Sequence, residues 1–167
     1  AGGLSAALTS KIAYNNLDLT MFMNGVLGGL VGITAGADQM LPTSAIFIGL
    51  IAGVIVVLSV ALLDKCKLDD PVGAIPVHLF CGIWGTLAVG LVGEMAGFDQ
   101  FMVQLACVAI TGAVCVIFGT FITLFVKSIA GLRVDEKLSR FFKCRDTVYI
   151  KQCGALQEHF QPDFFAF

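Results

Sequence analysis

One stretch decides the fold: residues 69–85 read DDPVGAIPVHLFCGIWG. Two carboxylates and a proline precede an uncharged run, and a single histidine, His78, lies inside that run. A helix that begins near Pro71 places His78 about 10 Å along a membrane span, at about 1.5 Å per residue. An ionisable side chain inside a span is by default a functional candidate that faces a cavity or a pathway. The alternative is a packing histidine whose ring is satisfied by a neighbouring helix.

The composition of the 167 residues indicates a lipid environment. Hydrophobic residues make up 57% of the chain and charged residues 13%, and the mean hydropathy is +0.91. Soluble domains carry roughly 25% charged residues, so this chain has too few charges to cover a surface exposed to water. The net charge is −2 and the first 126 residues hold no basic patch with interleaved aromatics, so we expect no nucleic-acid partner.

The uncharged runs predict an all-α, polytopic membrane helix bundle, because a spanning helix needs roughly 20 apolar residues. We expect one partial span and four full transmembrane helices, at residues 1–10, 20–37, 44–63, 71–93 and 101–126. The chain then divides into a membrane region, residues 1–130, and a tail, residues 131–167. Glycines at a spacing of four, in residues 25–36 and 49–53, predict close helix packing.

The basic residues outside the uncharged runs all lie in loops on one side of the predicted helix bundle. All ten Lys and Arg residues fall in the 11–19 turn, in the 64–70 loop or from residue 127 onward. The charged residues of the 38–43 and 94–100 loops are all acidic. Cytoplasmic loops carry an excess of Lys and Arg. We therefore expect a multi-pass integral membrane protein with its carboxyl terminus in the cytoplasm.

The other polar and reactive side chains favour structural roles. Asp69 and Asp70 suit the amino end of the histidine helix through its macrodipole, and Pro71 suits the first turn. The cysteines inside the apolar runs are interpreted as small core residues, and Trp84 either packs or lines a path. With no second metal ligand on the helix face of His78, and no nucleophile or cofactor motif, we expect no metal, no cofactor and no enzyme activity.

Three segments carry a family resemblance. They are NGVLGGLVGITAGA (24–37), DDPVGAIPVHLFCGIWGTLAVGL (69–91) and GLRV (131–134). The middle segment has an acidic pair, a proline, a histidine seven positions later and then glycines spaced by three. Over roughly residues 1–136 the chain resembles the ammonium transporter family, the Amt/Mep/Rh proteins.

The resemblance implies a fold and a function. Family members have eleven helices in two inverted repeats of five plus a last helix, form homotrimers in the plasma membrane, and conduct through an apolar pore with two histidines. His78 corresponds to the second pore histidine, which implies a proton relay with a partner histidine that this chain does not carry. Asn24 and Ala74 are weaker candidates for residues that line the same path. For Asn24 an interhelical hydrogen bond is an equal alternative. The implied substrate is ammonium or ammonia, with methylammonium as a further candidate.

Two departures from the family pattern bear on the interpretation. Leu79 stands where glycine usually follows the histidine, and the tail after residue 136 lacks the usual acidic ending, although it remains a candidate site for a cytoplasmic regulator. The chain is interpreted as the carboxyl-terminal half of a transporter. The alternatives are a non-conducting sensing or interaction module on the same scaffold and, less well supported, a membrane enzyme with His78 as general base.

Overall fold

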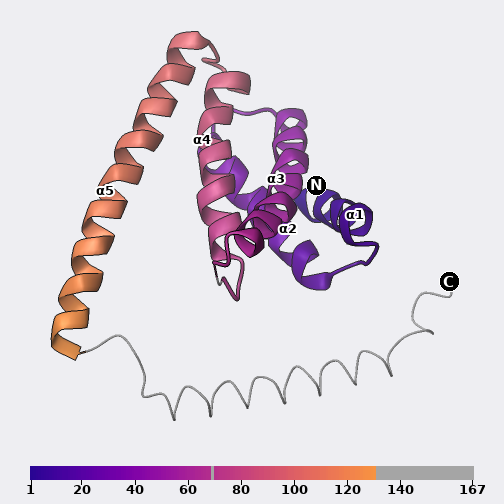
Figure 1. The fold of residues 1–167 in the computed structure, drawn as a ribbon. Helices are drawn as coiled ribbons and strands as arrows, with labels where there is room; N and C mark the ends of the chain where they lie inside the picture. The colour runs from indigo at the N-terminus through magenta and orange to yellow at the C-terminus, as the bar shows by residue number, and fades with distance from the viewer. Residues whose placement is uncertain (69, 131–167) are drawn as a thin grey trace. The chain divides into compact units, whose positions relative to one another are not determined.

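The computed structural model describes residues 1–68 and 70–130, and every regular element in these residues is a helix. The helices are α1 (Gly2–Tyr14), α2 (Leu19–Thr34), α3 (Pro42–Lys65), a π-helix η1 (Ile75–Phe80), α4 (Cys81–Val92) and α5 (Phe98–Ala130) (Figure 1). The predicted helical class is confirmed, and η1 with α4 corresponds to the histidine span. Asp69 and the tail, residues 131–167, lie outside the described residues.

Three of the described helical segments are long and apolar enough to cross a membrane. They are residues 42–65, the combined segment 75–92, and 98–129. The helix α2 is apolar but only 16 residues long, because it ends at Thr34 rather than at the predicted Ala37. Its start is fixed by Asp18, whose carboxylate accepts hydrogen bonds from the backbone of Thr20 (2.7 Å) and Met21 (3.4 Å).

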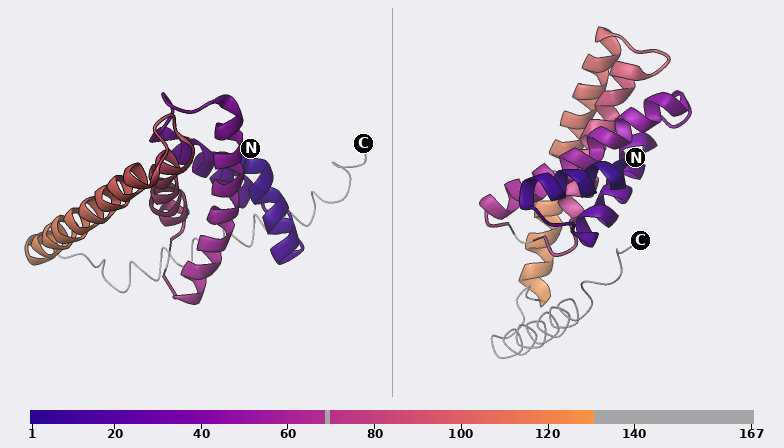
Figure 2. Two further views of the ribbon diagram at one scale, coloured as in Figure 1. Left: turned by 90° about the horizontal axis from the view of Figure 1, so that it is seen from above. Right: turned by 90° about the vertical axis from the view of Figure 1, so that its right-hand side faces the viewer.

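Glycines bring α1, α2 and α3 into close contact (Figures 1 and 2). A methyl group at Gly53 would overlap the carbonyl oxygen of Gly2 and the hydroxyl of Ser5, and one at Gly25 would overlap Ala6. The predicted glycine spacing therefore serves backbone approach, which stabilises helix pairs in lipid where little hydrophobic force acts between them. This packing belongs to residues 1–114, and residues 115–130 continue α5 as a separate unit.

The histidine segment is anchored to α3 by apolar contacts and two polar ones. Val77 and Cys81 pack with Ala52 and Val56 in the buried core, and the Cys81 thiol donates to the Ala52 carbonyl (3.6 Å). Trp84 Nε1 donates to the Ile48 carbonyl of α3 (3.2 Å) and its ring is half-buried against this core. The structure thus assigns Trp84 to packing, which the sequence left open.

The prediction that the cysteines inside the apolar runs fill a core is correct for Cys81 and wrong for Cys107 and Cys115. The structure leaves both of the latter exposed on α5. In a membrane protein an apolar side chain need not be buried in protein, because the hydrocarbon of the bilayer receives it equally well.

Candidate functional site

The candidate site begins where the chain enters the histidine helix. The two carboxylate oxygens of Asp70 accept hydrogen bonds from the backbone of Ala74 (3.0 Å) and Ile75 (2.7 Å). Pro76 has no N–H to satisfy, and the N–H of Val77 donates to the Gly73 carbonyl (3.1 Å). Every backbone donor of this first turn is therefore accounted for, as a helix end in an apolar setting requires.

This arrangement corrects the predicted helix start. Pro71 lies in a turn before the helix, and Gly73 follows it in the left-handed region (φ 73°). The proline of the first turn is Pro76, so His78 lies only about 6 Å beyond Ala74, at about 1.5 Å per residue. Asp70 keeps the structural role expected of it, but it acts through direct hydrogen bonds and not only through the helix dipole.

The first helical turns form a π-helix. The N–H of Cys81 donates to the carbonyl of Pro76, five residues earlier, where an α-helix would use the residue four back. Pro76, Val77 and Cys81 are fully buried, whereas His78 and Leu79 between them are exposed. Single π-turns inside helices occur frequently at functional sites. The hydropathy pattern did not predict this turn; Pro76, which has no backbone N–H, was the local signal for an irregular first turn.

The predicted site residues separate into two positions. Ala74 is exposed four positions before His78, so both occupy one exposed part of the helix. Asn24 instead is buried in α2, with 8% of its surface exposed, and a methyl group at Gly73 would overlap its amide nitrogen. The structure therefore brings Asn24 to the turn that precedes the histidine helix.

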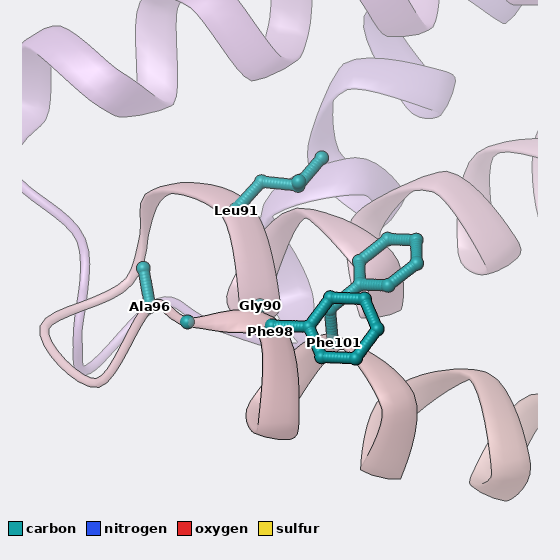
Figure 3. A pocket seen from close by; sticks show the side chains of 6 residues that line it. Gly90, Leu91, Ala96, Phe98 and Phe101 are labelled. Atoms are coloured by element: carbon teal, nitrogen blue, oxygen red, sulfur yellow. The ribbon is translucent and has the colours of Figure 1, made fainter.

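A cavity lies toward the far end of the histidine helix, and His78 is not among the residues that line it. This cavity, about 490 Å³, is lined by Gly90, Leu91, Ala96, Gly97, Phe98 and Phe101, about three helical turns or more beyond His78 (Figure 3). Within residues 1–68 and 70–130 no group of three or more His, Cys, Asp or Glu side chains is placed to hold a metal ion. The distinctive chemistry of this part of the chain is one exposed imidazole on a membrane helix.

Comparison with known proteins points to one family. A family model described as the Ammonium Transporter Family matches residues 1–140. The chain is 45% identical over 127 residues to the Synechocystis protein sll1017, which is named as a candidate ammonium transporter; the match covers 75% of this chain and 27% of that protein. It is 35% identical over 156 residues to the ammonium transporter Amt2 of Archaeoglobus fulgidus, covering 82% of this chain and 33% of the relative.

Solved structures show the same fold. A protein titled "Sensor Amt Protein" superimposes with a TM-score of 0.76 at 29% sequence identity. The match covers 80% of this chain and 35% of that protein's chain. Mep2 of Saccharomyces cerevisiae superimposes with a TM-score of 0.73 at 22% identity, covering 81% and 35%. The chain thus spans only about a quarter to a third of the length of these proteins.

Proposed function

The chain belongs to the ammonium transporter family and is an integral membrane protein, and from this premise we propose that it forms one half of a transmembrane path for ammonium or ammonia. The observation that supports the proposal most is the exposed imidazole of His78 on a membrane-spanning helix. The backbone donors of the first turn of that helix are satisfied by Asp70 and Gly73 and do not involve the imidazole.

The physical reason for a histidine is the cost of moving a charge through an apolar path. An ammonium ion loses its hydration there, whereas neutral ammonia passes at a much smaller cost. An imidazole can accept the proton at one ring nitrogen and release one at the other. In the proposed relay, His78 takes a proton from ammonium, ammonia crosses the constriction, and the proton moves on to a second histidine.

The second histidine of the proposed relay lies outside residues 1–68 and 70–130. Within the described residues His78 is the one histidine, and the chain spans about a quarter to a third of its relatives. The proposal therefore includes a complementary half with its own pore histidine. A homotrimer in the plasma membrane, methylammonium as an alternative substrate and a regulator at the tail are further parts of it, supported only by the family resemblance.

A second candidate function is ammonium sensing without conduction. One structural neighbour is titled a sensor Amt protein, which makes a sensing or interaction module on this scaffold a definite alternative. The two functions differ in whether substrate crosses the membrane.

Methylammonium uptake tests the proposal. Cells that lack their own ammonium uptake are expected to accumulate no tracer when they express residues 1–167 alone, because half of the path wall is missing. Co-expression with the complementary half is expected to restore uptake. Uptake by the chain alone would refute the half-path, and a correctly inserted pair that binds ammonium without transporting it would favour the sensor.

The orientation of the chain gives an independent prediction. By the positive-inside rule, the loop between α4 and α5 faces outward and the loop after α3 faces the cytoplasm. In intact cells a Gly97→Cys variant is expected to react with an impermeant thiol reagent. The native Cys66, exposed after α3, is the matched control and is expected to react only after permeabilisation. The reverse pattern would overturn the assignment.

A further inference from the structure

A row of small residues on α2 lies along the histidine helix. A methyl group at Gly28 would lie 3.1 Å from the sulfur of Cys81, and one at Gly85 would overlap the carbonyl oxygen of Gly32. Asn24 lies one turn before Gly28 and therefore on the same face of α2. A glycine has no side chain that could stop one helix from sliding along another. The glycines of this row thus set the distance between the two helices, and Asn24 is the residue that can set their relative height.

Asn24 meets the histidine helix at the glycine that precedes it. The three atoms nearest to a methyl group at Gly73 would be the amide nitrogen, carbon and oxygen of Asn24. Both residues are buried. The φ of Gly73, 73°, lies in the left-handed region, which glycine adopts without strain. Glycine is therefore required at position 73 both by the backbone conformation and by the space that the amide leaves.

The turn that contacts Asn24 is joined to the histidine helix by hydrogen bonds. The N–H of Gly73 donates to the carbonyl of Asp70 (3.3 Å), and the carbonyl of Gly73 accepts from the N–H of Val77 (3.1 Å). The carboxylate of Asp70 binds the next two backbone N–H groups. Val77 immediately precedes His78 in the helix. A displacement of Gly73 is therefore transmitted to His78 through one hydrogen-bonded turn.

From this geometry we propose that Asn24 is a positioning residue, whose amide fixes Gly73 against α2 and thereby sets the depth of His78 in the membrane. The inference rests on the proposed transport function, because the depth of a proton acceptor matters only to a path that uses it. Proton transfer requires the acceptor to be within hydrogen-bond reach of the donor. A misplacement of about 1 Å can lower the rate of such a step by about 100-fold.

The test compares single and double variants in the chain co-expressed with the proposed complementary half. Gly73→Ala places a methyl group against the amide of Asn24, and it is expected to lower ammonium flux per folded molecule by about tenfold or more. Addition of Asn24→Ala removes the obstructing amide. The double variant is expected to recover several-fold of the loss, because the effects of residues in contact are not additive. Gly112→Ala, with no atom within 4 Å of its methyl group, is the matched control and is expected to keep its flux.

The double variant also distinguishes positioning from direct binding of substrate. It lacks the amide, so it cannot recover flux if Asn24 itself has to touch ammonium. A double variant that transports no better than Gly73→Ala would therefore contradict the positioning role.

A second comparison separates positioning from a role in stability alone. Gly73→Ala is repeated in a His78→Ala background, where no imidazole remains to be aligned. Positioning predicts little further loss of the residual flux per folded molecule. A residue that only stabilises the fold would cause the same fold-change in both backgrounds, and that result would overturn the proposal.

A third readout does not depend on transport. Cys81 is buried three residues beyond His78, and a buried thiol is inert toward alkylating reagents. Displacement of the helix by Gly73→Ala is expected to raise the rate at which N-ethylmaleimide modifies Cys81 by several-fold, as measured by mass spectrometry of its peptide. The rate is expected to fall again in the double variant and to stay unchanged in Gly112→Ala.

The outcomes separate the inference from the function beneath it. Equal alkylation rates in Gly73→Ala and Gly112→Ala would contradict the positioning by Asn24, whether or not the protein transports ammonium. The expected change in alkylation, in an unmodified pair of halves that transports no ammonium, would overturn the proposed function and leave Asn24 as the residue that fixes the height of the helix.

Discussion

Replacement of His78 by alanine, in the chain co-expressed with the proposed complementary half, is expected to lower ammonium flux by about 100-fold, or to admit potassium, because the proton acceptor is lost while an apolar path remains. The flux of ammonium and that of potassium are measured in the same vesicles. Proton transfer by a positioned side chain contributes about 100-fold or more to the rates that depend on it. A loss of this size is therefore the expected signature of a relay.

The matched variant keeps a proton acceptor at the same position. His78→Glu is expected to retain partial conduction, since a carboxylate can accept a proton and also stabilises a cation in the path. A histidine that only packs would behave differently, because both substitutions would then lower the yield of folded protein and leave its selectivity intact. Normal ammonium flux with normal potassium exclusion in folded His78→Ala would end the relay hypothesis.

Gly53→Val is expected to destabilise the helix bundle by about 3 kcal/mol, at the upper end of what overpacking costs. A side chain at this position would overlap the carbonyl oxygen of Gly2 and the hydroxyl of Ser5, and the backbone nitrogen of Ala6 lies only 2.9 Å from the position of its Cβ. Two of these three obstacles are backbone atoms, so α1 and α3 would have to move apart. The midpoint of thermal unfolding in detergent, followed by the fluorescence of the single tryptophan, Trp84, measures the effect.

Gly112→Val is the control for this prediction. Gly112 lies in α5 with no atom within 4 Å of an added Cβ, so the same substitution meets no obstacle there. Its unfolding midpoint is expected to stay close to that of the unmodified chain. Equal midpoints for the two variants would show that the contact between α1 and α3 does not depend on glycine at position 53.

The sequence alone determined the helices of the membrane region and the family. The predicted spans 44–63, 71–93 and 101–126 correspond to the observed helices α3, η1 with α4, and α5. This agreement has a physical cause, because in lipid a segment must satisfy its own backbone hydrogen bonds, which makes each long apolar run a helix. The family could also be identified from the sequence, because the spacing of the acidic pair, the proline and His78 lies within one short stretch of chain.

Only the tertiary structure decided how the histidine segment is arranged. The helix begins after Gly73 and not at Pro71, and it opens with a π-turn that exposes His78 together with Leu79. These features depend on contacts with residues distant in sequence, such as Cys81 with Ala52 of α3. Hydropathy reports how apolar a run is but not which neighbour each side chain packs against.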